Sequence, residues 1–198
     1  KSSNFTRGRD PLGIQNSSIS IYATLLPGMT NLTLRLRYYG LYLWLLDEYD
    51  KLPSNNIFKS DFAQQYNFVR RAELVIALLM RNNFPKEQSI IGSNFADKHL
   101  SELNQSGSFD IALGADKNKD TIKGSVYWDY NSGALGQYYA GSLIALSLIE
   151  FKEGFFRRTD VNGVNLAQAY RNSISEESSS LFLSIISNGT IKLSDLNL

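Results

Sequence analysis

The sequence predicts a mainly α-helical protein, built as a helical bundle. Apolar residues recur at the spacing of one helix face in several long segments, most clearly over 32–52 and 60–82. Pro, Ser and Asn cluster between these two segments, at 53–56, where a helix does not easily continue. A chain of 198 residues can bury a core of such helices without disulfides, and it contains no cysteine.

The first two predicted helices lie on either side of Pro27. Residues 14–26 carry apolar side chains on one face, and that helix should end at Pro27. Residues 32–52 are apolar around nearly the whole circumference, which predicts a central helix. Gly40 lies in its middle, where glycine costs about 1 kcal/mol relative to alanine. We therefore expect another helix to approach closely at Gly40.

The spacing of apolar residues predicts one more long helix, and the helical signal then becomes weaker towards the middle of the chain. Ser60 is the predicted N-cap of a third helix, which continues to Asn82 with its apolar residues in register. A short helix is predicted around 95–103. The polar stretch 116–124 is interpreted as an exposed loop or a connection between two lobes.

The last third of the chain predicts three more helices and one aromatic interruption. A helix is predicted over 133–151, followed by the compact aromatic and basic stretch 155–160. Residues 162–163, Asn-Gly, are interpreted as a turn that leads into a helix over 164–174. A last helix is predicted over 175–189, between a serine N-cap and a closing glycine.

These segments predict two helical domains. We expect a helical core domain over 1–105, a connecting loop region over 106–132 and a second helical domain over 133–198. The final residues, 194–198, are typical of the capped first turn of a helix, so we expect the chain to continue beyond Leu198.

Charge and hydropathy narrow the classes of partner. The formal charge is +1, with 20 basic and 19 acidic residues, which removes the simplest argument for a nucleic-acid-binding protein. The longest apolar runs, 41–46 and 143–149, are far shorter than the roughly 20 residues that span a bilayer, so no membrane segment is predicted. The absence of cysteine and of an apolar segment after the basic N-terminus predicts a cytoplasmic protein.

One polar stretch matches the first part of the calcium-binding loop pattern. The oxygen-bearing residues of Asp116–Asp120 fall at the first, third and fifth positions of such a loop. Thr121 then stands where the sharp turn requires glycine, and Tyr127 stands where a bidentate glutamate should close the coordination shell. A solvated loop is the favoured interpretation. We predict no metal and, since no phosphate-binding glycine motif occurs, no cofactor.

Two residues are candidates for acid/base chemistry. His99 is the only histidine, which excludes a two-histidine metal site, and it lies on the polar side of a short predicted helix. Asp129 lies among aromatic residues that could raise the pKa of its carboxyl group, but no second carboxylate accompanies it at fixed spacing. We interpret both as structural or surface residues, and an enzyme that uses His99 or Asp129 stays an alternative.

Arginines are the main candidate binding residues. Arg35 and Arg37 lie in the apolar helix and cannot lose their charge, so they must reach solvent, contact a ligand or form ion pairs. Glu73 and the acidic residues 47–50 are available partners, and an ion pair that fixes helix register is favoured. The residues predicted to bind nucleic acid or a partner are Arg35, Arg37, Arg70, Arg71, Arg157, Arg158 and Arg171.

The segment 133–170 resembles the end of a winged-helix module, in which a helix is followed by a wing and then another helix. The resemblance implies that 155–160 forms a wing strand, that Arg157 and Arg158 face phosphate and that the helix from Gly133 occupies the recognition position. That helix offers almost no side chain for reading bases, so we favour protein docking over nucleic-acid contact.

Three blocks of sequence together resemble a family of uncharacterised bacterial proteins. The signature of that family is LPG-x-T, then R-x-R-Y-(Y/F), then W in one helix. The resemblance carries no established activity, and the family's association with restriction or anti-phage defence genes implies a role in bacterial defence. The blocks are 10–13, then 26–30 with 35–39 and 44–46, and finally 133–139 with 163–170.

From these observations we predict a mainly α protein, a helical bundle with a winged-helix-like second half. We expect a non-catalytic, cytoplasmic interaction subunit or domain of a bacterial defence assembly, which docks partner proteins and, as a second class of partner, nucleic acid. The alternatives are a winged-helix DNA-binding regulator and an enzyme using His99 or Asp129. The oligomeric state is left open.

Overall fold

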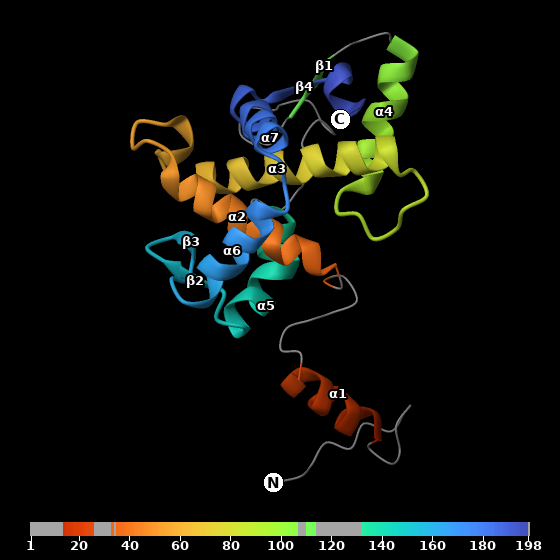
Figure 1. Cartoon of the computed structure of the whole chain (residues 1–198). Helices are drawn as coiled ribbons and strands as arrows, with labels where there is room; N and C mark the ends of the chain where they lie inside the picture. The colour runs from red at the N-terminus through yellow and green to blue at the C-terminus, as the bar shows by residue number, and fades with distance from the viewer. Residues whose placement is uncertain (1–13, 26–32, 34, 107–109, 114–131, 198) are drawn as a thin grey trace.

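The computed structural model describes residues 14–25, 33, 35–106, 110–113 and 132–197. This part of the chain is mainly helical, which confirms the predicted fold class. Most of the helices gather into one bundle, and α1 stands apart from them (Figure 1). The helices are α1 (Ile14–Leu25), α2 (Leu36–Lys51), α3 (Phe62–Asn83), α4 (Ser93–Ser106), α5 (Ala140–Ala145), α6 (Asn162–Asn172) and α7 (Glu176–Asn188), with short helical turns η1 (Ile57–Lys59), η2 (Leu135–Tyr139) and η3 (Leu193–Asn197).

The strands form two small antiparallel pairs. β2 (Ile149–Lys152) and β3 (Phe155–Arg158) make a hairpin between α5 and α6, which is the position predicted for a wing. β1 (Asp110–Ala112) pairs with β4 (Thr190–Lys192), which follows α7. No helix in the described part of the chain is both long enough and apolar enough to cross a membrane.

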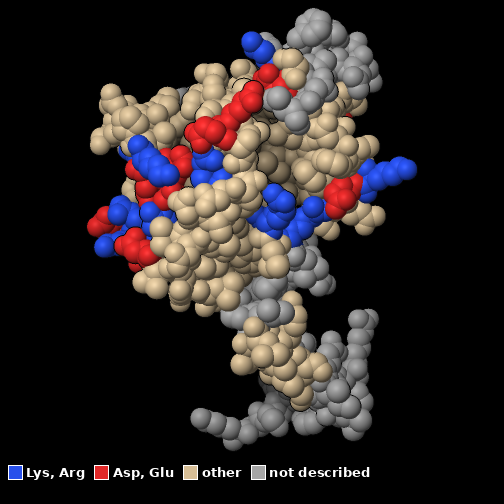
Figure 2. Space-filling view, viewed as in Figure 1, with Lys and Arg blue, Asp and Glu red and all other residues tan. Residues whose placement is uncertain are grey.

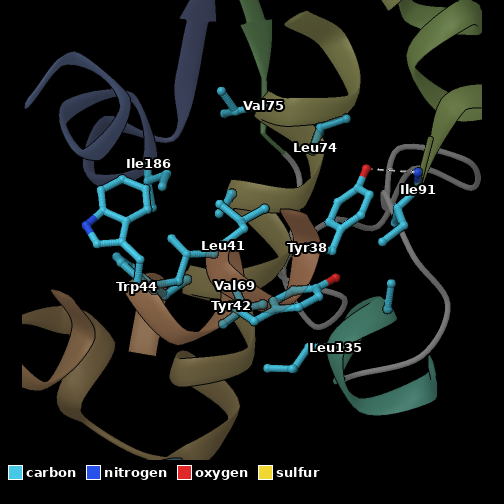
Figure 3. Close-up of a cluster of buried hydrophobic side chains, with 14 of the residues drawn as sticks. Tyr38, Leu41, Tyr42, Trp44, Val69, Leu74, Val75, Ile91, Leu135 and Ile186 are labelled. Carbon is cyan, nitrogen blue, oxygen red and sulfur yellow. Dashed lines mark hydrogen bonds between the residues drawn. The ribbon is translucent and has the colours of Figure 1, made fainter. Parts of the chain in front are cut away.

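The central helix is α2, as predicted from its apolar circumference. All residues from Tyr38 to Leu46 are buried. α6 packs along one side of α2, and α3 crosses on another side (Figure 1). One buried cluster joins both predicted domains, since it includes Tyr42, Val69, Leu135 and Ile186 (Figure 3). The predicted linker 106–132 lies mostly outside the described residues, and the division into two domains stays a prediction.

At Gly40, α6 packs closely against α2. A Cβ atom added at Gly40 would lie 2.6 Å from the ring of Tyr170 and 3.1 Å from the Tyr170 Cβ. The prediction of a close helix contact at this glycine is therefore confirmed, and the packing explains why a glycine is kept inside a helix.

Replacing Gly40 with alanine is expected to destabilise the protein by about 1–3 kcal/mol, because the overpacking exceeds the gain in helix propensity. Urea unfolding measures the effect. The matched control is Gly141→Ala in α5, where an added Cβ meets nothing within 4 Å, so that variant should be neutral or slightly stabilised. Equal stability of the two variants would contradict the close contact.

The predicted helix over 133–151 is wrong in its second half. α5 ends at Ala145, Ser147 adopts a left-handed backbone with φ of 56°, and Ile149 begins a strand. The chain can turn back at Glu153-Gly154, where φ is 55° and 85°, so pairing with β3 replaces the helix. A short apolar run such as this one suits a strand as well as a helix.

Two predicted boundaries also need correction. Gly163 lies inside α6 and not in a turn before it; an added Cβ there would lie 2.3 Å from the carbonyl oxygen of Leu148, so the glycine serves close packing. The N-cap of α3 is Asp61 and not Ser60, because the Asp61 carboxylate accepts a hydrogen bond from the Gln64 amide at 3.0 Å.

The boundaries of α7 follow the prediction. Ser175 is its N-cap, and the serine hydroxyl accepts a hydrogen bond from the Ser178 amide at 3.0 Å. Gly189 ends the helix in the left-handed conformation, with φ of 73°, which few residues other than glycine adopt easily.

Candidate interaction site

The two arginines around the start of α2 have different surroundings. Arg35 forms an ion pair with Glu87 and also donates a hydrogen bond to the Gln88 carbonyl oxygen. Sequence reasoning had suggested Glu73 as a partner, but the loop after α3 folds back on α2 and brings Glu87 to Arg35. Arg37 is exposed and has no ion-pair or hydrogen-bond partner among the described residues.

Both arginines of the predicted wing strand form ion pairs. Arg158 pairs with Asp47 of α2 and lies 3.2 Å from Asp160, and Arg157 lies 3.6 Å from an acidic residue of the hairpin turn. Burial raises the pKa of Asp47, but hydrogen bonds from a neighbouring lysine and from Arg158 outweigh burial and lower it overall. Arg158 therefore fastens the hairpin to α2, and phosphate would have to compete with Asp47.

The three remaining candidate arginines also belong to the fold. Arg70 is 1% exposed, which leaves it no access to a ligand at the surface. Arg71 donates a hydrogen bond to the Ile186 carbonyl oxygen at 2.8 Å and so ties α3 to α7. Arg171 pairs with Glu176, which fixes the turn between α6 and α7.

Charges of both signs are interspersed on one face of the molecule (Figure 2). On the face drawn in Figure 2, acidic side chains lie beside basic ones without a continuous basic patch. Of the seven candidate arginines, Arg37 alone is exposed and without an ion pair among the described residues. Nucleic-acid binding generally relies on several accessible cations, so this arrangement offers little support for it.

Of the candidates for acid/base chemistry, His99 alone lies within the described residues. His99 lies in α4 with its ring centroid 4.4 Å from that of Phe95. Asp129 and the calcium-like stretch 116–120 lie outside the described residues. Within the described ranges, no group of three His, Cys, Asp or Glu side chains could hold a metal ion.

Glu73 is a buried carboxylate that organises the core. It is 1% exposed, and it accepts hydrogen bonds from the Tyr42 hydroxyl at 2.9 Å and from the amides of Ala134 and Leu135 at 3.0 and 2.9 Å. A negative charge at the amino end of a helical segment is favourable. Glu73 thus anchors the start of η2 on α3, and burial makes it a structural group.

A row of four aromatic rings, exposed at its two ends, joins α3 to the hairpin. We call it the aromatic ladder: Phe62 and Tyr66 of α3, Phe156 of β3 and Phe151 of β2. Successive ring centroids are 6.0, 6.0 and 5.0 Å apart. The two ends, Phe62 and Phe151, are 53% and 54% exposed, although large aromatic side chains usually gain from burial.

Gln65 holds the hairpin against α3 beneath the aromatic ladder. Its side-chain amide donates to the Phe156 carbonyl oxygen at 2.9 Å, and its carbonyl oxygen accepts from the Phe156 amide at 2.9 Å. Gln65 is 1% exposed, so both bonds are shielded from water. The hairpin turn also reaches the ladder, because a Cβ at Gly154 would lie 3.8 Å from Phe62. The ladder is therefore rigidly positioned before any partner binds.

Sequence reasoning missed the aromatic ladder. A signal for the hairpin was present in the alternation of Ile149 and Phe151 before the Glu153-Gly154 turn, but such alternation puts both side chains on one face and does not indicate that Phe151 is exposed. The pairing of that hairpin with α3 joins residues about ninety positions apart and has no local signal. Comparisons with models of protein families, with curated proteins and with solved structures find no match to this chain.

Proposed function

We propose that this chain is a non-catalytic helical interaction domain that docks a partner protein through the aromatic ladder. The observation that carries the proposal is the exposure of Phe62 and Phe151 at the ends of a pre-positioned row of rings. The resemblance to a bacterial family associated with defence genes suggests a cytoplasmic defence assembly as the setting.

The chemistry of the surface supports a protein partner over nucleic acid. Aromatic side chains are enriched among the residues that contribute most to protein interfaces, and rigid side chains lose little entropy on binding. The ladder is bordered by Asp61 and by the paired Arg157, so its edge is polar and of mixed charge. An apolar centre with a polar rim is typical of protein interfaces.

The test compares wild-type protein with the double variant Phe62→Ala/Phe151→Ala. Each purified protein is used as bait in extract of the native host treated with nuclease, and the partner identified is then purified and titrated by calorimetry. Truncation of the two exposed aromatic residues is expected to weaken binding at least about 30-fold, equivalent to about 2 kcal/mol.

Phe84→Ala is the matched control, because Phe84 is an equally exposed phenylalanine, 58% accessible, just past the other end of α3. Because a helix rises 1.5 Å per residue, Phe84 lies about 33 Å from Phe62 along the axis of α3. The control should bind the partner as wild type does. Equal affinity of wild type and of the ladder variant would overturn the proposal, as would binding that is lost on nuclease treatment.

A further inference from the structure

A cavity of about 400 Å³ opens between α2, α3, α6 and α7, away from the aromatic ladder. Its walls are largely apolar and include Leu41, Ile76, Leu79, Phe182 and Ile185. Small-molecule sites commonly occupy about 300–1,000 Å³ and are lined mainly by apolar side chains. The dimensions and the lining are those of a site for the apolar part of a small ligand.

Arg37 is the one positively charged side chain among the described residues that line this cavity. It lines the cavity and is exposed, so it lies at the open side, and among the described residues it has no ion-pair partner. Burial raises the pKa of the Tyr170 hydroxyl in the cavity wall, and the positive charge of Arg37 opposes that rise. Asp195, an acidic residue of the lining, already accepts hydrogen bonds from Lys192 and Ser194.

Trp44 contributes an unusual buried group to the wall of the cavity. Its side chain lines the cavity and is 2% exposed, yet its indole N–H has no hydrogen-bond partner among the described residues. Buried tryptophan N–H groups usually have one. In Figure 3 the indole nitrogen points away from Leu41, Val69 and Tyr42. Neighbouring atoms cover the nitrogen, so Trp44 itself offers no polar contact to an occupant, and Arg37 is the cation in the lining that a carboxylate could reach.

We propose that this cavity binds a free amphipathic carboxylate of medium length, with its chain among the apolar walls and its carboxylate on Arg37. At about 30 Å³ for each water-sized unit, the cavity holds roughly a dozen non-hydrogen atoms, as in a ten-carbon fatty acid. A bidentate arginine–carboxylate contact provides the polar specificity. This site is independent of the proposed docking surface.

The test titrates the whole chain with decanoate below its aggregation concentration, by calorimetry and by tryptophan fluorescence, to which Trp44 contributes. Decanoate should bind at one site per chain with a dissociation constant below about 1 mM. Decanol, which lacks the charge, and acetate, which lacks the chain, should each bind at least tenfold more weakly. Vesicles of phosphatidylglycerol should not sediment the protein.

Three variants separate the roles of charge and cavity. Arg37→Gln should weaken decanoate binding at least tenfold and leave decanol binding unchanged. Leu79→Trp should fill the cavity and abolish both, with circular dichroism to show that it is folded. Arg157→Gln, which lies outside the cavity, should bind as wild type does.

Several results would overturn the inference. The first two are the absence of decanoate binding at 1 mM and an equal affinity of wild type and Arg37→Gln for decanoate. The other two are decanoate binding by folded Leu79→Trp that is as strong as that of wild type, and binding of the protein to vesicles but not to monomeric decanoate. None of these results depends on whether a partner protein uses the aromatic ladder, so the two proposals can fail separately.

Discussion

Replacing Glu73 with alanine is expected to destabilise the protein by about 3–5 kcal/mol, which is the usual cost of breaking a buried polar or ionic network. The change removes the acceptor of three hydrogen bonds, from the Tyr42 hydroxyl and from the amides of Ala134 and Leu135. At 1% exposure, water cannot replace the lost acceptor without opening the core. Urea unfolding at neutral pH measures the loss as a lower midpoint.

Two further variants distinguish this mechanism from a general effect of removing a glutamate. Glu73→Gln keeps one oxygen acceptor and should cost less than alanine, about 1–3 kcal/mol. Glu87→Ala removes an exposed carboxylate, paired with Arg35, and should change stability by no more than about 1 kcal/mol. A Glu73→Ala variant within about 1 kcal/mol of wild type would show that Glu73 is not the anchor of η2.

The features that could be predicted from the sequence are those set by local chemistry. The core role of α2 follows from its apolar circumference, and the caps of α7 follow from a serine and a glycine at its ends. The close contact at Gly40 was also predictable, because a glycine inside an apolar helix is costly unless a neighbour requires the space.

The features that could not be predicted depend on contacts between distant segments. The strand at Ile149 forms because a partner strand and two left-handed turn residues are available, while its own apolar pattern is ambiguous. The partners of the arginines likewise come from far along the chain, with Glu87 52 residues from Arg35 and Asp47 111 residues from Arg158. The spacing of residues within a single helix cannot indicate such pairs.

The same long-range packing changes the functional interpretation of the basic residues. Arginines near Gly133–Tyr170 suggested phosphate contacts, but Arg158 is held by Asp47 and Arg171 by Glu176. The accessible features that remain are aromatic rings on one side and an apolar cavity with Arg37 on another. Both favour recognition of apolar surfaces, which sequence charge alone does not reveal.

Replacing Gly133 with alanine is expected to cost about 2–5 kcal/mol, the second-largest effect of a single change. Gly133 has φ of 62°, where an alanine is strained by about 1–2 kcal/mol. A Cβ there would also lie 2.8 Å from Arg70 Cγ and 2.8 Å from Glu73 Oε2, both on buried side chains. The new methyl group would push the Glu73 carboxylate away from the backbone amides whose hydrogen bonds it accepts. This overpacking adds about 1–3 kcal/mol to the cost.

Gly154→Ala isolates the backbone contribution to this effect. Gly154 also has a positive φ, 85°, but the atom nearest to a Cβ added there lies 3.8 Å away. Only the conformational strain of about 1–2 kcal/mol therefore applies. The difference in unfolding free energy between the two alanine variants therefore measures the steric pressure on Glu73 and Arg70 together. In the Glu73→Ala background the part due to Glu73 is removed, so the cost of Gly133→Ala should fall and only the contact with Arg70 should keep it above that of Gly154→Ala. Additive costs in the double variant would show that Gly133 and Glu73 are not coupled, and the anchoring of η2 would then need another origin.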